Sequence, residues 1–211
     1  MAASRSYGGI PAEQRRGQRR VALVAAGVEI VGTQGAARLT VGGLCSQAGL
    51  NERYFYESFA SSEDVLVAVF DEVMAELTAV IVAAVAAAAD DARAKARAAI
   101  AAAVELLTDD PRKTRIVFVE PLAAAALNSR RAEVGRSFVG LIVAQAHEFY
   151  GSATALRIGT WADFAAAHLL GGLAETLTAW VRGDLAISRE ELIERSTELF
   201  VLVADHVVGT G

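Results

Sequence analysis

Apolar side chains recur every three or four residues in one segment of this chain after another, and this helical period constrains the fold more than any other feature. The clearest case is residues 65–81, where valine, leucine, isoleucine, phenylalanine and methionine keep that spacing. Proline, which interrupts helices, occurs only three times in 211 residues, while alanine, the strongest helix former, is abundant. No alternating apolar run bounded by turn residues indicates a strand. The sequence therefore predicts an all-α protein.

Capping residues predict where several of these helices begin. Ser61, with Asp64 three residues later, resembles a capping box for a long helix that reaches about residue 88. Ser188 with Glu191 forms another for a last helix through about residue 207. Asp110 followed by proline predicts one more start, because proline at the first helical position loses no hydrogen bond. Further helices are expected over residues 18–32, 90–108, 130–150 and 157–182.

Residues 40–59 predict two short helices joined by a tight turn. Thr40 is expected to cap the first helix and Asn51 the second, while Gly49 between them occupies a position that favours positive φ. Such a pair can place the first turn of its second helix in the major groove of DNA. A purely structural helical hairpin is the alternative. The apolar seam between the two helices is expected to consist of Leu44, Ala48, Leu50, Phe55 and Phe59.

The side chains left outside that seam are suited to contact DNA. Arg53 can donate two hydrogen bonds to a guanine edge, Tyr54 can pack on a thymine methyl or contact phosphate, and Tyr56 can hydrogen-bond a phosphate. For both tyrosines, a half-buried surface aromatic is the alternative. The full set of expected DNA-contacting residues is Arg19, Arg20, Thr40, Asn51, Arg53, Tyr54, Tyr56 and Ser62.

Charge is distributed unevenly along the chain. The net charge is −5, but residues 1–60 carry seven arginines against four glutamates, which gives +3 there and leaves −8 for residues 61–211. Four of those arginines lie within residues 15–20, and a local basic patch of this kind is what phosphate contact requires. A solvated arginine-rich tail would have the same composition, so this pattern alone leaves both interpretations open.

Aromatic and histidine side chains of the C-terminal half are candidates for lining an apolar cavity that would suit a small lipophilic ligand. Plain core packing is the alternative for each of them. The three histidines do not fall at metal-ligand spacing and no cysteine pair accompanies them, so we expect neither a metal nor another cofactor. The candidate ligand-binding residues are Phe118, His147, Tyr150, Trp161, Phe164 and His168.

Several other classes of protein are disfavoured by the sequence. Cys45 is the only cysteine, so it cannot form an intrachain disulfide, and we expect it to be a small buried hydrophobe. The longest apolar run, residues 79–89, is far shorter than the roughly 18 residues that indicate a membrane span. No nucleophile elbow, phosphate-binding loop or zinc-protease motif is present. We expect a soluble cytoplasmic protein that does not bind membranes and is not an enzyme.

The region around the two short helices resembles the tetracycline-repressor (TetR) family of transcriptional regulators. The resemblance covers about residues 18–75, and residues 180–185, leading into the last helix, are similar to the family's final two helices. The residues that carry it are Gly35, Thr40-Val41, Ala48-Gly49-Leu50, Tyr56-x-x-Phe59, and Ser61-x-Glu63-x-x-Leu66.

This resemblance implies an organisation for the whole chain. About nine helices would follow a flexible arm over residues 1–14, with a three-helix DNA-binding domain over 15–60 and a larger ligand-binding and dimerisation domain over 61–211. Two subunits would form a homodimer through a four-helix bundle of their last two long helices and bind double-stranded DNA at a palindromic operator. A small apolar ligand would separate the two DNA-binding heads and release the operator, as in a repressor. The expected dimer contacts are Leu169, Leu173, Leu177, Leu199 and Val203.

Three departures from the family pattern support an alternative. Ser62 stands where the family often has lysine, and Arg53 where it often has a small residue. Gly42 and Gly43 replace better helix formers, and each glycine lowers the stability of the helix by about 1 kcal/mol relative to alanine. The alternative is a helical small-molecule-binding protein with a degenerate DNA-binding head. A helical-bundle enzyme is a third hypothesis, and it would need a metal or cofactor.

Overall fold

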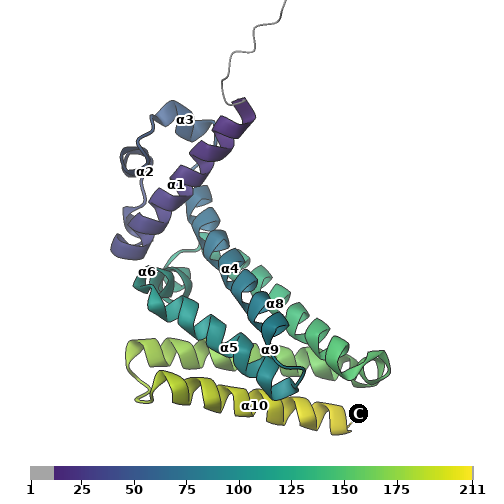
Figure 1. The fold of residues 1–211 in the computed structure, drawn as a ribbon. Helices are drawn as coiled ribbons and strands as arrows, with labels where there is room; N and C mark the ends of the chain where they lie inside the picture. Colours follow the sequence, from purple (N-terminus) through teal and green to yellow (C-terminus); the bar gives the residue numbers. More distant parts are fainter. Residues whose placement is uncertain (1–11, 211) are drawn as a thin grey trace, which may run out of the picture.

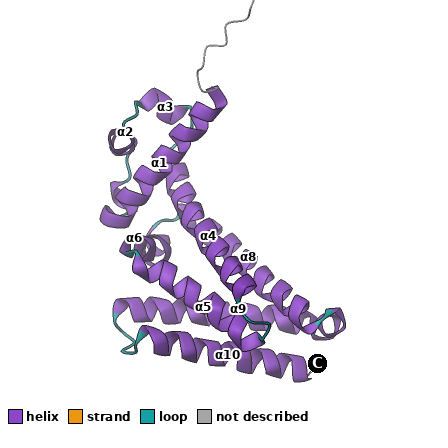
Figure 2. Cartoon of the chain, in the orientation of Figure 1, coloured by secondary structure: helices purple, strands orange, loops and turns teal. Residues whose placement is uncertain are grey.

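The computed structural model describes residues 12–210, and the side chains within that range except those of residues 12, 122–123, 152–158 and 210. All regular structure in this range is helical (Figures 1 and 2), which confirms the predicted fold class. Counting the continuous stretch from α6 to α7 as one helix, the range holds nine α-helices, the number that the resemblance implied. The elements are α1 (Ala12–Gln34), η1 (Ala36–Arg38), α2 (Val41–Ala48), α3 (Glu52–Tyr56), α4 (Ser62–Ala87), α5 (Ala92–Asp109), α6 (Pro111–Thr114), η2 (Arg115–Val119), α7 (Glu120–Ala123), α8 (Ala126–Tyr150), α9 (Ser152–Arg182) and α10 (Arg189–Thr210).

The first helix starts earlier than its apolar period indicates. Residues 12–14, which were expected in the flexible arm, are the first residues of α1, and the rest of that arm lies outside the described residues. The physical reason is composition, since alanine, glutamate and glutamine all favour helix and Glu13 faces the positive end of the helix dipole. An apolar stripe is needed to pack a helix against a core, but not to form its solvent-exposed first turns.

The caps of the two short helices form as the sequence predicts. Thr40 Oγ1 accepts a hydrogen bond from the Gly43 N–H at 3.1 Å, and Asn51 Oδ1 accepts one from the Tyr54 N–H at 3.1 Å. Gly49 between the helices has φ 65°, the left-handed conformation that favours glycine. We call α1, α2 and α3 together the head of the molecule.

Helix α4 joins the head to the remaining helices, which we call the body (Figure 1). It begins with the predicted capping box of Ser61 and Asp64 and runs between the two parts, with α5 and α8 beside its C-terminal half. The long helices α9 and α10 lie side by side at the far end of the body. One continuous cluster of buried apolar side chains extends from Leu23 in α1 to Ile193 in α10. The head therefore packs on the body through a shared core, with α4 contributing to both.

The stretch from α6 to α7 changes its helical geometry on the way. Asp110 caps it by accepting a hydrogen bond from the Arg112 N–H, and Pro111 occupies the first helical position, as the sequence predicts. The middle segment η2 is π-helical, and Pro121 lies in the first turn of α7 directly after it. A proline nitrogen cannot donate to the carbonyl one turn before it, and a wider turn accommodates its ring there. This geometry buries both Ile116 and Phe118.

We expect the substitution Gly27→Ala to destabilise the protein by about 1–3 kcal/mol, because added volume in a packed core forces its neighbours to shift. A Cβ at Gly27 would lie 2.6 Å from Val69 Cγ2 and 3.1 Å from Val65 Cγ1, both on stiff, β-branched, buried side chains of α4. The matched control is Gly17→Ala in the same helix, where nothing lies within 4 Å of the added atom. That variant should be up to about 1 kcal/mol more stable than wild type. Urea unfolding of both variants measures the difference, and equal stabilities would contradict the close approach of α1 and α4.

Among the described residues, no helix combines the length and the hydropathy that crossing a lipid bilayer demands.

Candidate DNA-binding surface and ligand cavity

Helix α3 divides its side chains sharply between the interior and the solvent. Phe55 is fully buried, with its ring centroid 5.2 Å from that of Tyr56 and 6.2 Å from that of Phe59. The Arg53 side chain is 85% exposed and Tyr56 is 59% exposed, while Tyr54 is 37% exposed. A buried aromatic thus anchors a helix of five residues, whose other large side chains face solvent.

Arg19 and Arg20 of α1 pack against this helix and the turn that follows it. Arg19 Nη2 lies 2.9 Å from Glu57 Oε2, and its guanidinium is 4.3 Å from the centre of the Tyr54 ring. Arg20 donates to the Ser58 carbonyl at 3.3 Å and sits 4.1 Å from the centre of the Phe59 ring. The Arg19 side chain is only 20% exposed, so its main role in the structure is to hold α3 on α1. That Arg19 and Arg20 contact DNA phosphates stays a prediction.

The other expected DNA-contacting residues lie at helix starts. Thr40 and Asn51 are exposed caps of α2 and α3, and their side-chain oxygens already accept the hydrogen bonds described above. Ser62 is the half-exposed first residue of α4. All eight predicted residues therefore belong to the head or to its junction with α4, at one end of the molecule (Figure 1).

Cys45 lies inside the head rather than on this surface. It is buried in α2, which confirms the expected small buried side chain. Burial raises the pKa of the Cys45 thiol, and the negative charge of Glu52 raises it further. The thiol is therefore protonated, and unreactive, at neutral pH.

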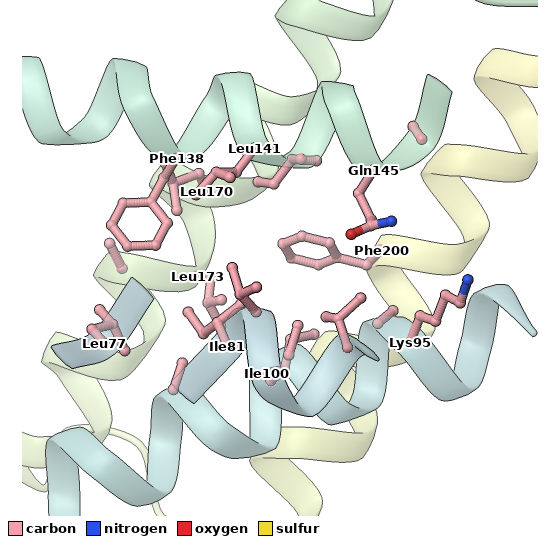
Figure 3. A pocket seen from close by; sticks show the side chains of 18 of the residues that line it. Leu77, Ile81, Lys95, Ile100, Phe138, Leu141, Gln145, Leu170, Leu173 and Phe200 are labelled. Atoms are coloured by element: carbon pink, nitrogen blue, oxygen red, sulfur yellow. The ribbon is translucent and has the colours of Figure 1, made fainter. Parts of the chain in front are cut away.

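The body contains an apolar cavity of about 340 Å³, partly open to solvent, between α4, α5, η2, α8, α9 and α10 (Figure 3). Among the described residues, only three polar side chains line it, namely Lys95, Gln145 and Tyr150. Burial raises the pKa of the Tyr150 hydroxyl, with smaller contributions from the charges of Asp205 and Asp91. The large apolar lining side chains include Leu77, Ile81, Ile100, Phe118, Phe138, Leu141, Phe149, Leu170, Leu173 and Phe200.

The structure places only two of the six predicted ligand-binding residues on the wall of this cavity. These are Phe118 and Tyr150. Trp161 and Phe164 are exposed on the outer face of α9, stacked with centroids 5.3 Å apart, and Phe164 stacks in turn on His168. His147 is exposed on α8. Spacings of three and four residues put Trp161, Phe164 and His168 on one helix face, and the small alanines of α9 occupy the buried face instead.

Several lining residues were missed by sequence reasoning. Phe138, Leu141 and Gln145 are visible in the sequence as one face of a helix, and a glutamine within such an apolar stripe is the signal that could have pointed to a cavity. Lys95 gave no comparable signal, because a single lysine in an alanine-rich helix normally faces solvent. Its position on the wall follows only from how α5 packs against α4 and α10.

Two of the predicted dimer residues face the interior of the subunit. Leu177 is buried in the main core and Leu173 lines the cavity. Leu169 and Val203 line a small hollow of about 60 Å³ between α9 and α10, and of the five predicted residues only Leu199 is exposed. Both helices are apolar on more than one side, so periodicity cannot decide which side faces outward. Among the described side chains of these two helices, the large exposed apolar residues are Trp161, Phe164, Val181, Leu199 and Leu202.

A buried carboxylate joins the body to the end of α1. Glu120 is 5% exposed; its Oε2 accepts from the Ala36 N–H at 2.8 Å, and its Oε1 lies 2.8 Å from Arg115 Nε. Arg115 also donates to the Thr33 carbonyl at 3.3 Å. These bonds connect η2 and α7 directly to the last turn of α1 and the bend that follows it, in which Gly35 has φ 94°.

A second ion pair reinforces the same junction. Arg112 of α6 lies 2.8 Å from Glu29 Oε2 of α1, and Asp110 holds the other side of its guanidinium. The two carboxylates raise the pKa of Arg112, mainly through the hydrogen bonds that its guanidinium donates to Asp110. Gly32 lets the backbones approach here, since a Cβ on it would lie 2.9 Å from the Arg112 Cα. The junction of head and body, which we define as Glu29, Thr33, Ala36, Arg112, Arg115 and Glu120, is therefore close-packed and charged.

The described residues do not include a group of three or more histidine, cysteine, aspartate or glutamate side chains placed to hold a metal ion.

Comparisons with known proteins identify the architecture. No protein-family model and no curated protein matches the chain. Among solved structures, the fatty acid degradation regulator FadR from Bacillus halodurans aligns with TM-score 0.69 and 20% identity over 86% of this chain and 94% of its own. FadR from Bacillus subtilis, in complex with stearoyl-CoA, aligns with TM-score 0.66 and 20% identity, over 87% of this chain and 97% of its own. A TetR family transcription regulator from Marinobacter aquaeolei aligns with TM-score 0.58 and 18% identity, over 90% of this chain and 97% of its own. The chain thus has the fold of TetR-family transcriptional regulators, with the helix-turn-helix head at its N-terminal end.

Proposed function

We propose that this protein is a transcriptional regulator of the TetR family, a repressor that a small lipophilic ligand releases from its operator. The observation that carries the proposal is the side-chain division of α3, in which buried Phe55 fixes the helix while Arg53 and Tyr56 face solvent. Solved structures of the same fold are named as regulators. The positive charge of residues 1–60, against the negative charge of the rest, favours approach to DNA by the head.

The cavity supports the ligand part of the proposal. Its volume lies within the range of small-molecule sites, and its walls are apolar with a few polar groups, which is typical of such sites. The similar FadR structure from Bacillus subtilis contains stearoyl-CoA, a ligand with a long hydrocarbon chain. A lipophilic ligand is therefore the class that this cavity accommodates best.

Segment η2 provides a route from the cavity to the DNA-binding head. Val117 and Phe118 line the cavity, while Arg115 in the same segment and Glu120 directly after it bind the end of α1. A ligand that displaces Phe118 would shift Glu120 and with it α1, on which α3 is held by Arg19. A ligand acts in this way only if it binds one arrangement of the junction more tightly than the other.

The exposed apolar face of α9 and α10 supports a homodimer. Phe164 is 60% exposed, Leu199 58% and Leu202 66%, which is unusual for large apolar residues of a monomer. In this proposal these residues and Trp161 form the subunit interface, in place of Leu173 and Leu177. A two-fold dimer places two heads on symmetric half-sites, which predicts a palindromic operator.

A duplex-library selection with the purified protein tests the proposal. It should recover a symmetric motif, and fluorescence anisotropy at two salt concentrations should show sequence-specific binding at physiological salt. If the selection yields no symmetric motif and binding stays non-specific, the alternative of a binding protein with a degenerate head is favoured instead.

The substitution Arg53→Ala should relax base preference at one position of each half-site. We expect a loss of about 1–3 kcal/mol in discrimination there, because a bidentate arginine–guanine pair contributes that much. The comparison is Arg20→Ala, which should weaken binding evenly across sequences and lower the salt slope by about one. Anisotropy titrations with the selected duplex and its single-base variants measure both. An Arg53→Ala protein with unchanged discrimination at every base would show that this side chain does not contact the bases.

A further inference from the structure

Lys95 is the only charged side chain that lines the cavity among the described residues. It comes from the first turn of α5, and its side chain is 22% exposed. Its Nζ lies 2.8 Å from Asp90 Oδ1 and 5.3 Å from the centre of the Phe149 ring, which also lines the cavity. The ammonium group therefore stands at the boundary between the apolar interior and the solvent.

The remaining polar groups of the wall lie toward the same end. Figure 3 shows Lys95 and Gln145 on one side of the cavity with Phe200 between them, and Tyr150 ends the same helix as Gln145. The opposite end, near the head, is formed by apolar residues such as Leu107, Val117 and Phe118. The cavity thus has one polar end and one apolar end.

The cavity is also elongated. Its lining residues extend from Ala92 to Leu107 on α5 and from Phe138 to Tyr150 on α8. At a rise of about 1.5 Å per residue, these stretches are about 22 Å and about 18 Å long. A long, narrow apolar space with polar groups at one end fits a molecule with a hydrocarbon chain and a single polar head.

The charge of that head follows from the partners of Lys95. Asp90 is 90% exposed, and an ion pair with so exposed a carboxylate is weak, so a ligand can replace it. The other carboxylates at this end do not line the cavity: Asp91 accepts from the Ala94 N–H as the cap of α5, and Asp205 is exposed to solvent. Solvent screens these charges more strongly than an interaction at the cavity wall.

From these observations we infer that the cavity binds anionic amphiphiles, with the hydrocarbon chain along α5 and α8 and the anionic head at Lys95. Lys95 is then the residue that selects the head group. This inference rests on the proposed function only in taking the cavity as the ligand site. The head group is a carboxylate or a phosphate, both of which an ammonium group binds through charge-assisted hydrogen bonds.

Calorimetric titration of the full chain with four probes tests the inference. The probes share a twelve-carbon chain and differ in their heads: dodecanoate, dodecyl phosphate, dodecanol and dodecyltrimethylammonium. Wild-type protein should bind at least one of the two anions about tenfold more tightly than dodecanol, and the cation most weakly. The tighter of the two anions identifies the head group.

Two lysine variants make the test specific. Lys95→Met keeps the apolar stem but removes the charge, and it should abolish the preference for the anions while dodecanol binding stays the same. The matched control is Lys113→Met, which removes a lysine of similar exposure that pairs with Glu76 at 2.6 Å and does not line the cavity. That variant should keep the wild-type preference. Thermal unfolding of each variant confirms that it is folded before titration.

The contrary results are distinct for the two proposals. Equal binding of dodecanol and both anions by wild type, tightest binding of the cation, or an anion preference that survives Lys95→Met would overturn the role of Lys95. The first and third of these would leave an apolar ligand site in place. Failure of all four probes to bind would overturn the ligand site as well. Binding of dodecanoate that leaves DNA affinity unchanged would count against the proposed regulation alone.

Discussion

Replacing Phe55 with alanine should lower the free energy of unfolding by about 3–5 kcal/mol and abolish specific DNA binding. The ring is fully buried and contacts the rings of Tyr56 and Phe59, so its removal leaves a cavity beneath a helix of only five residues. Helix α3 has too few internal hydrogen bonds to persist without that anchor. Guanidinium unfolding followed by circular dichroism measures the stability, and anisotropy with the selected duplex measures binding.

The neighbouring residue supplies the matched control. Tyr56 is next to Phe55 on the same helix but is 59% exposed, so Tyr56→Ala should change stability by less than about 1 kcal/mol. It should nevertheless weaken DNA binding, because a phosphate donor is lost. A Phe55→Ala protein that bound the operator as wild type does would rule out α3 as the recognition helix.

Replacing Glu120 with alanine should destabilise the protein by about 1–3 kcal/mol, because it leaves the part-buried Ala36 N–H without its acceptor and Arg115 without its carboxylate. The same change should uncouple the cavity from the head. In wild type we expect dodecanoate to weaken DNA binding, and in Glu120→Ala the DNA affinities with and without dodecanoate should converge. Chemical unfolding and paired anisotropy titrations measure the two effects.

Two further variants define what Glu120 contributes. Glu120→Gln keeps an oxygen that can accept from Ala36 but loses the charge that holds Arg115, so it should fall between wild type and alanine in both measurements. Glu105→Ala removes an exposed carboxylate of α5 and should affect neither. A Glu120→Ala protein whose ligand response equalled that of wild type would show that the signal does not pass through this contact.

The sequence predicted local features well because they depend on residues only a few positions apart. Thr40, Asn51, Ser61 and Ser188 form the caps expected of them, since a side-chain oxygen reaches an N–H two or three residues later whatever the rest of the chain does. The turn at Gly49 is determined in the same way. The seam of the short helices follows from the helical period, which places Leu44 and Phe55 inside.

The sequence by itself thus determined the helices, their caps and the helix-turn-helix, through propensity and period. Only the tertiary structure decided which faces of α8, α9 and α10 are interior, and with them the cavity. Trp161 and Phe164 are outside it and Leu173 and Leu177 inside the subunit, because these helices carry apolar residues on several sides and the packing of five long helices selects one. The contact of Glu120 with Ala36, residues 84 positions apart, likewise has no local signal. This contact forms because the packing of α1 on α4, α6 and η2 brings Glu120 next to the end of α1.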